Sequence, residues 1–323
     1  MLKVNKLTVS SAPHIRSSSA TNRVMLDVII ALLPTAIAGS VIFGWQAIAT
    51  ILICVLSSVL AEFIYNLILK KEQTVGDFSA AVTGLLLGLN MPANFTEIWW
   101  QCIIGSAFAI IVVKCLFGGL GANFANPAIT GRIFMMICYT GTVGKSVFPI
   151  IGSAELSTGA TPLVVLGSDN ISSLPSLFDM LLGLRGGAIG EVCILALLVG
   201  FVYLVVRRVI YFETPLIMIG TVFVLSLLVS NDPVYALYQV MSGGLILGAV
   251  FMATDYVTTP INRTGKMIFA LGAGLITVLI RLYGSYPEGV SFAILLMNIL
   301  SPYIEKWTAK RPLGAKRVKG GTK

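Results

Sequence analysis

Ten long stretches of the sequence carry almost no charged residues, and this constrains the fold more than any other feature. About 20 mostly apolar residues are needed to cross the roughly 30 Å hydrocarbon core of a membrane. Only 11% of the 323 residues are charged, against about 25% in soluble domains. Because lipid leaves no partner for unpaired backbone groups, such stretches predict helices. We therefore expect an all-α integral membrane protein of about ten transmembrane helices, at 24–42, 46–69, 77–91, 97–117, 124–140, 187–206, 214–230, 234–252, 265–282 and 286–304.

Positive charge is concentrated in both tails and in alternate loops, and this predicts the orientation in the cell membrane. Cytoplasmic loops of membrane proteins carry an excess of Lys and Arg. With both tails cytoplasmic, the cytoplasmic loops contain Lys70, Lys71, Lys114, Arg207, Arg208, Arg263 and Lys266, and the outer side has only Lys145, Arg185 and Arg281. A basic tail also occurs in nucleic-acid-binding proteins. Beside a terminal apolar helix it indicates a membrane anchor, so no nucleic-acid partner is expected.

A weak internal repeat predicts how the helices are organised. The pentapeptide at 84–88 (Gly-Leu-Leu-Leu-Gly) resembles the one at 244–248 (Gly-Leu-Ile-Leu-Gly). Five spans in each half would place the halves in opposite orientations, which is an inverted repeat with short or broken helices. The predicted parts are a cytoplasmic tail at 1–23, repeats at 24–140 and 187–304, an extracytoplasmic loop at 141–186 and a basic cytoplasmic tail at 305–323.

Polar breaks at the ends of apolar stretches predict two sites, one toward each membrane face. The breaks at 121–128 and 254–260 would lie on the cytoplasmic side, and those at 90–92 and 286–288 on the outer side. Irregular backbone at membrane depth is tolerated where it lines a cavity or binds a ligand.

The segment 155–163 (Glu-Leu-Ser-Thr-Gly-Ala-Thr-Pro-Leu) is the most specific motif in the sequence. Gly159 and Ala160 leave room for a bulky approach to the hydroxyl of Thr161, and Pro162 restricts the backbone after it. Such a hydroxyl suits covalent modification, although the same residues also form ordinary turns.

Several segments, taken in order, resemble the RnfD/NqrB family of membrane flavoproteins. The motif Thr158-Gly159-Ala160-Thr161 is similar to the family's flavin-attachment motif, although Glu155 stands where an Asp is often found. Further similar segments are 11–16, 25–34, 121–132, 185–191, 254–260 and 286–293. The long N-terminal extension typical of NqrB is missing, which favours the RnfD branch.

The resemblance implies two flavin cofactors. FMN would be joined to Thr161 through a phosphoester bond made by a flavin transferase, with Thr158, Gly159 and Ala160 completing the motif. Riboflavin would bind without a covalent bond, and we expect it near Asn123, Asn126, Thr258 and Thr259. Amide groups supply the donors and acceptors that a flavin edge needs, but Asn and Thr also cap helices.

Acidic residues inside membrane segments are candidates for an ion path. Here they are Asp27, Glu62, Glu191 and Asp255, of which Asp27 and Glu191 could instead mark helix starts. With a single His and no C-x-x-C pair, no metal site and no catalytic residue are expected. The five cysteines are interpreted as packing residues, and whether one contacts an iron–sulfur cluster of a partner stays open.

The resemblance implies a membrane subunit that relays electrons between ferredoxin and NAD, coupled to Na⁺ or H⁺ movement. It would act as part of a translocating oxidoreductase, with partners that include a second FMN-carrying subunit and iron–sulfur membrane subunits. The alternatives are a quinone-reducing NqrB-like subunit, a channel or carrier built on inverted repeats, and a scaffold that only retains the motif.

Overall fold

The computed structural model describes residues 21–148, 157–159, 161–167, 174–284 and 288–309. The first part comprises α1 (Thr21–Phe43), α2 (Trp45–Ile68), η1 (Val75–Asp77), α3 (Ser79–Leu89), α4 (Phe95–Ala107), the π-helical η2 (Phe108–Cys115) and α5 (Pro127–Cys138). The middle holds α6 (Thr140–Val143), β1 (Ser146–Phe148), β2 (Ser157–Gly159), α7 (Pro162–Gly167) and α8 (Leu177–Leu182). The last part comprises α9 (Ile194–Val206), α10 (Glu213–Ser230), α11 (Pro233–Met241), α12 (Leu245–Leu247), the π-helical η4 (Gly248–Met252), α13 (Arg263–Tyr283) and α14 (Val290–Thr308).

The helical multi-pass membrane fold is confirmed, but the number of ten spans is not. Among the described residues, five helices are long and apolar enough to cross a membrane: α1, α2, Phe95–Cys115, α10 and α13. A sixth span results if α11 and Leu245–Met252, bent by 64°, are counted together. The apolar helices α3, α5 and α9 have only 11 to 13 residues. At 1.5 Å per residue they extend roughly 17–20 Å, less than the hydrocarbon thickness.

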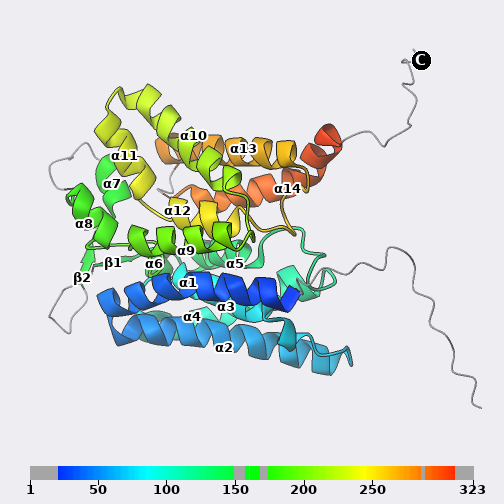
Figure 1. The fold of residues 1–323 in the computed structure, drawn as a ribbon. Helices are drawn as coiled ribbons and strands as arrows, with labels where there is room; N and C mark the ends of the chain where they lie inside the picture. The colour runs from blue at the N-terminus through cyan, green and yellow to red at the C-terminus, as the bar shows by residue number, and fades with distance from the viewer. Residues whose placement is uncertain (1–20, 149–156, 160, 168–173, 285–287, 310–323) are drawn as a thin grey trace, which may run out of the picture.

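Corresponding helices in the two parts pack in a similar order. The second long helix, α2, contacts α3 and α4, and its counterpart α10 contacts α11 and α13. Helices α1 and α9 pack directly against each other. In Figure 1, α1 to α4 lie in the lower part of the view and α10 to α14 in the upper part, with α5 and α9 between them. The inverted relation of the two halves stays a prediction.

Small residues allow the closest helix approaches. A Cβ on Gly200 of α9 would overlap the carbonyl oxygen of Ala31 in α1. A Cβ on Gly84 of α3 would lie 2.6 Å from the carbonyl oxygen of Cys54 in α2. Membrane helices gain little from hydrophobic contact with each other, so such close packing contributes much of their association.

The short helix α3 ends inside the protein, where other backbone groups satisfy its terminal carbonyls. The amides of Gly190 and Ile189 donate to the carbonyl oxygens of Leu89 and Met91, at 2.7 and 3.0 Å. Gly190 is required for this approach, since a Cβ there would lie 2.6 Å from the Leu89 Cβ. The irregular segment before α9 therefore completes the end of α3.

The segment 141–186, predicted as a polar loop, contains a small two-stranded sheet and short helices in its described residues. Strand β1 pairs antiparallel with β2, with Val147 opposite Thr158, and Val147 also forms a bridge with Gly187. These pairings connect the attachment motif to the segment that leads into α9. The all-α description therefore has this one exception among the described residues.

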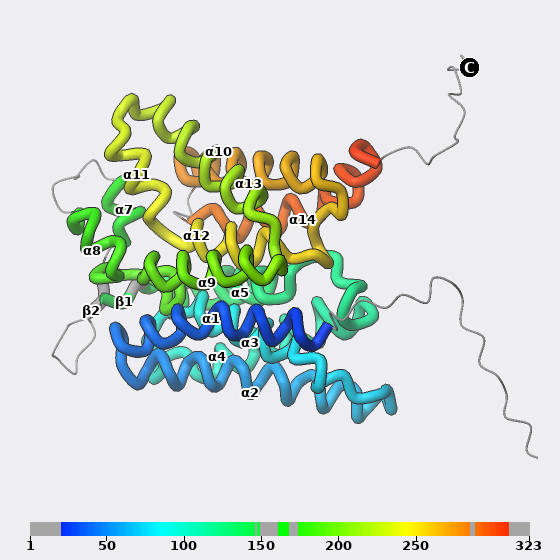
Figure 2. The backbone as a smooth tube through the Cα atoms, in the orientation of Figure 1, coloured from blue at the N-terminus to red at the C-terminus, as the bar shows by residue number. Residues whose placement is uncertain are grey.

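Both ends of the described bundle lie on the same side. The backbone trace in Figure 2 shows the start of α1 and the end of α14 at the right, and β1 and β2 at the left. This arrangement agrees with two tails on one membrane face, while the assignment of that face to the cytoplasm stays a prediction.

We predict that Gly200→Ala weakens the contact between α1 and α9. The added Cβ would overlap the Ala31 carbonyl, and overpacking of this kind costs about 1–3 kcal/mol. The midpoint of thermal unfolding in detergent should fall. The control is Gly220→Ala in α10, where a Cβ meets no atom within 4 Å, and an unchanged midpoint for Gly200→Ala would contradict the packing.

Candidate functional site

Two polar cavities lie at opposite ends of the short helix α3. Ser79, at the start of α3, lines one cavity, and Asn90, just after its end, lines the other. The 11 residues of α3 correspond to roughly 16 Å along a helix axis. Phe251 and Thr254 line the first cavity and Gly243 the second. The segment from Gly243 to Thr254 therefore runs antiparallel to α3 between the same two cavities.

The Thr161 cavity, named for the residue on its wall, has a volume of about 300 Å³. Thr161 precedes α7, and the Val164 amide donates to both its carbonyl oxygen and its Oγ1, at 2.9 and 3.3 Å. Pro162 occupies the first turn, where its missing N–H is no loss. The backbone thus holds the hydroxyl at the cavity wall, with its own proton not used in this cap.

A buried charge cluster occupies the floor of the Thr161 cavity. Arg132 of α5 donates to Asn90 Oδ1 and to Glu288 Oε2, and so joins α3, α5 and the segment before α14. The second carboxylate, Glu191, accepts from the Ala188 amide at 2.8 Å, while its Oε2 is buried with no hydrogen-bond partner among the described residues.

A glycine lets both carboxylates approach the bend between α11 and α12. The amide of Gly244 donates to Glu288 Oε1 at 3.2 Å. A Cβ at this position would lie 2.7 Å from Glu288 Oε1 and 3.0 Å from Glu191 Oε2. Any larger residue would therefore displace the acidic pair.

Two further arginines hold the backbone around this cluster. Arg185, only 2% exposed, donates to the carbonyl oxygens of Met241, Glu191 and Val192. Arg281 donates to the carbonyl oxygens of Gln239 and Ser242, at 2.6 and 3.0 Å. The sequence predicted both on the outer side, in a loop or near a helix end, but they cap the broken helix α11–α12 from inside the protein.

The lining of the Thr161 cavity favours an anion. Its charged residues are Arg132, Lys145, Arg185, Glu191 and Glu288, three cations and two carboxylates, which leaves one positive charge in excess. In a site of low dielectric constant an uncompensated charge acts strongly on a ligand.

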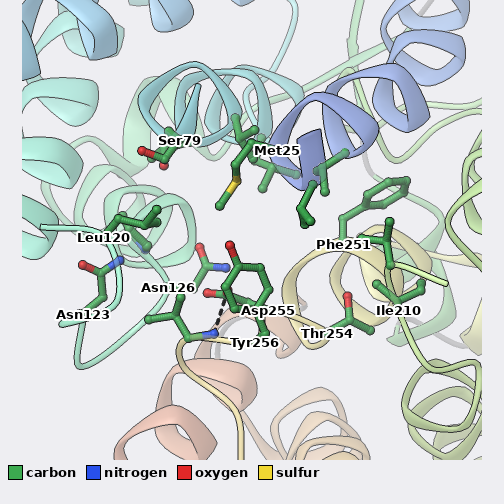
Figure 3. Close-up of a pocket in the computed structure, with 18 of the residues that line it drawn as sticks. Met25, Ser79, Leu120, Asn123, Asn126, Ile210, Phe251, Thr254, Asp255 and Tyr256 are labelled. Carbon is green, nitrogen blue, oxygen red and sulfur yellow. Dashed lines mark hydrogen bonds between the residues drawn. The ribbon is translucent and has the colours of Figure 1, made fainter. Parts of the chain in front are cut away.

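The second cavity, here called the amide cavity, is lined by Asn123, Asn126 and Asp255 and has a volume of about 90 Å³ (Figure 3). Asn126 caps α5, because its Oδ1 accepts from the amides of Ala128 and Ile129 at 3.0 and 3.4 Å. Asn123 Oδ1, in contrast, is buried and has no hydrogen-bond partner among the described residues. An acceptor left without a donor in a cavity indicates a place for a ligand N–H or O–H.

The predicted threonines do not line the amide cavity. The hydroxyl of Thr258 donates to Asp255 Oδ2 at 3.1 Å, and that of Thr259 to the Asp255 carbonyl at 2.5 Å. Both side chains are therefore used to fold the turn that positions Asp255. Tyr256 and Thr254 line the cavity instead, as Figure 3 shows.

A buried ion pair borders the amide cavity. Lys114 Nζ lies 2.7 Å from Glu62 Oε1 and donates to Ser79 Oγ at 2.6 Å. The Thr74 hydroxyl also donates to Glu62 Oε1, at 2.7 Å, whereas Glu62 Oε2 has no hydrogen-bond partner in the described part of the chain. Lys114, predicted from the sequence in a cytoplasmic loop, is only 2% exposed and lies within η2.

The four acidic ion-path candidates do not form one continuous row. Asp255 lines the amide cavity and Glu62 lies one residue behind its wall, whereas Glu191 belongs to the Thr161 cavity. Asp27 accepts from Tyr203 and Arg207 at the end of α9, at 2.9 and 3.2 Å. No single path through all four is traced by the described residues.

The remaining motif residues are only partly described. Thr158 and Gly159 lie on β2, and Ala160 and Glu155 lie outside the described residues. Sequence reasoning missed Arg132, Glu288 and Lys114 as site residues. Their signal was a charge inside, or at the break of, an apolar stretch, which lipid does not tolerate without a partner.

These features define a multi-pass helical membrane protein with polar sites buried at both ends of one short helix. A family model described as NQR2, RnfD, RnfE family matches residues 8–314, and the chain belongs to this family.

Relatives with assigned names match nearly the full length. An Acetobacterium woodii protein, named as the D-type subunit of a Na(+)-translocating ferredoxin:NAD(+) oxidoreductase complex, is 46% identical over 97% of both chains. A Clostridium ljungdahlii protein, named as the D-type subunit of a proton-translocating ferredoxin:NAD(+) oxidoreductase complex, is 38% identical over 98% of both. The D-type subunit of the Stutzerimonas stutzeri ion-translocating oxidoreductase complex is 37% identical, over 92% of this chain and 93% of its own.

We predict that Lys114→Met destabilises the protein strongly, because it leaves the Glu62 carboxylate buried without its counter-ion. Breaking a buried pair on one side costs about 3–5 kcal/mol. The double variant Lys114→Met/Glu62→Leu should recover much of this loss when unfolding is measured in detergent titrations. The control is Lys145→Met, whose pair with Glu97 is half exposed and contributes about 0–1 kcal/mol. Equal losses in the single and double variants would contradict the assigned pair.

Proposed function

We propose that this chain is the D-type membrane subunit of an ion-translocating ferredoxin:NAD oxidoreductase complex. Support comes from family membership and from full-length relatives that carry this name. The chain would work as one subunit of the enzyme, together with a second FMN-carrying subunit and iron–sulfur membrane subunits. The observation that carries the proposal is the position of Thr161 on the wall of a charged cavity.

FMN joined to Thr161 fits the first cavity. The hydroxyl belongs to a helix cap at the cavity wall, and the excess positive charge of Arg132, Arg185 and Lys145 favours a phosphodiester. A volume of about 300 Å³ lies at the lower end of typical cofactor cavities, roughly 300–1,000 Å³. When bound, a flavin supplies one- and two-electron transfer, and the protein tunes it by burial and hydrogen bonds.

Riboflavin fits the donor and acceptor set of the amide cavity. The unpaired Oδ1 of Asn123 would accept from a ring N–H, and Asp255 and Tyr256 would line the opposite wall. The volume of about 90 Å³ is below the usual range for a bound ring, so side chains such as Met25 and Leu120 would have to move outward.

The arrangement of the two cavities suits a relay. They lie at opposite ends of α3, and the fully buried Leu87 and Leu89 fill the layer between them. Apolar packing at this depth excludes water between the cofactor sites. Fixed positions on short, buried helices keep the separation constant, which a cofactor relay requires.

Coupling to ions would use the acids beside the cavities. Glu62 and Asp255 adjoin the amide cavity, and Glu191 adjoins the Thr161 cavity. A change of charge in a cavity can shift an ion equilibrium only through a differential interaction with such groups. The names of the two ferredoxin-linked relatives differ in the ion, sodium in one and protons in the other, so the choice between Na⁺ and H⁺ is left open.

We predict that the wild-type chain, produced with its flavin transferase, fluoresces under ultraviolet light on a denaturing gel and that Thr161→Ala does not. The matched control is Thr140→Ala, which removes another hydroxyl from the same cavity. A dark wild-type band, with the transferase active on another substrate, would reject covalent flavin and favour a channel or carrier. An NqrB-like subunit would fluoresce equally and is distinguished by quinone as electron acceptor.

We predict that Asn123→Leu removes the non-covalent flavin only. Acid precipitation separates released flavin from protein-bound flavin in one sample, so the covalent fraction serves as the internal control. The released flavin should fall by about tenfold, since loss of one hydrogen bond and insertion of an apolar side chain costs about 1.5 kcal/mol or more. An unchanged ratio of released to covalent flavin would place the second flavin elsewhere.

A further inference from the structure

A third and larger cavity, here called the basic cavity, lies at the ends of several membrane helices. It has a volume of about 930 Å³. Its charged residues are Arg23 at the start of α1, Arg207 and Arg208 after α9, Lys266 in the first turn of α13, and Asp27 of α1. Four cations and one carboxylate leave three positive charges in excess.

The single carboxylate is already used. Asp27 accepts from the Arg207 Nε and from its terminal nitrogen, at 3.3 and 3.2 Å, and from the Tyr203 hydroxyl at 2.9 Å. Lys266 Nζ lies 4.7 Å from the centre of the Tyr211 ring, a cation–π contact that leaves its charge in place. Arg208 has no ion-pair partner within the described part of the chain. Asp27 thus orients Arg207 but does not neutralise the cavity.

The tails of this chain supply no acidic side chain to compensate the cavity. Residues 1–20 contain Lys3, Lys6 and Arg16 and no Asp or Glu. Residues 310–323 are similarly basic and contain no Asp or Glu. Charge complementarity therefore requires an anion from outside these segments.

The rim of the basic cavity has the composition of a membrane–water interface. Val206, Tyr211 and Phe212 are 74%, 64% and 51% exposed, and they border the two arginines in sequence. Exposed aromatic and aliphatic side chains beside cations at helix ends are typical of the headgroup layer. A water-facing protein surface would leave these apolar groups in solvent.

We propose that the basic cavity binds the phosphate headgroup of an anionic phospholipid. Arg207 and Arg208 provide planar guanidinium groups suited to phosphate oxygens, and Lys266 provides a point charge on the opposite wall. The buried hydroxyl of Thr214 adds a polar contact on the lining. The volume accommodates a headgroup, while Val206 and Phe212 lie where acyl chains would begin. The site requires neither flavin and lies outside the proposed electron relay.

The test compares wild type with Arg208→Gln/Lys266→Gln, using the full chain in neutral detergent. Phosphatidylglycerol binding is measured by native mass spectrometry and by the lipid-induced rise in the thermal unfolding midpoint. Each Lys or Arg near a lipid surface contributes about fivefold in affinity, so the double variant should bind roughly thirtyfold more weakly. Its unfolding midpoint without lipid should match that of wild type, because neither side chain has an ion-pair partner among the described residues.

The control variant is Lys70→Gln/Lys71→Gln, after α2. It matches the test pair closely, since Lys70 has a positive φ of 52° where Arg208 has 56°, and Lys71 lies over the Tyr65 ring. The control should keep wild-type lipid affinity. An equal loss in both variants would show a general charge effect and overturn the specific site.

Three other results would also overturn the proposal. Phosphatidylcholine could stabilise the wild type as well as phosphatidylglycerol, which would remove the role of headgroup charge. Inorganic phosphate could match the lipid at equal concentration, which would identify a free-phosphate site. The double variant could keep lipid affinity but lose partner subunits when the whole complex is purified, which would identify a protein-docking surface.

Discussion

The structure depends on satisfying backbone polar groups at the ends of helices too short to cross a membrane. Helix α3 ends inside the protein, and the amides of Ile189 and Gly190 pair with carbonyls at and just after its end. Helix α11 breaks before α12, and there Arg185 and Arg281 donate to the exposed carbonyls. Without these partners the broken helices would leave unpaired groups at a cost of several kcal/mol each.

The same constraint creates the polar sites. A helix that stops at membrane depth leaves space beyond its end, and the residues that satisfy that end line the space. Arg132, for example, bonds to Asn90 after α3 and to Glu288 before α14. Asn126 caps α5 beside the amide cavity in the same way. Cavity and helix end are therefore one feature of the fold, and loss of the capping side chain would affect both.

Ionic groups in this protein are buried at two depths with different consequences. Lys114 and Glu62 form a pair that is almost fully buried behind the amide cavity, whereas the basic cavity keeps a charge excess at the helix ends. A paired charge in a site of low dielectric constant contributes specificity and little net charge. An unpaired excess near the surface instead attracts anions, and salt screens it. The buried pair and the basic cavity thus use opposite electrostatic arrangements.

Local pattern was enough to predict the membrane class, because apolar length is a property of consecutive residues. Each of the ten predicted stretches overlaps a helix, and the polar breaks at 121–128 and 254–260 do meet at one cavity. Helix length was predicted less well. The segment before α9 was included in a span, although Arg185 and its pairing with α3 keep residues 187–193 irregular.

The sequence alone determined the membrane class, the broken helices and the candidate attachment residue Thr161. Only the tertiary structure decided which charges are buried and with which partner. Arg132 and Glu288 are 156 residues apart in sequence, and Lys114 and Glu62 are 52 apart. Thr258 and Thr259 fold back on Asp255 instead of lining a cavity. Local patterns record the hydrophobicity of a segment, but a buried polar group takes whichever partner the packing of distant helices brings within hydrogen-bond distance.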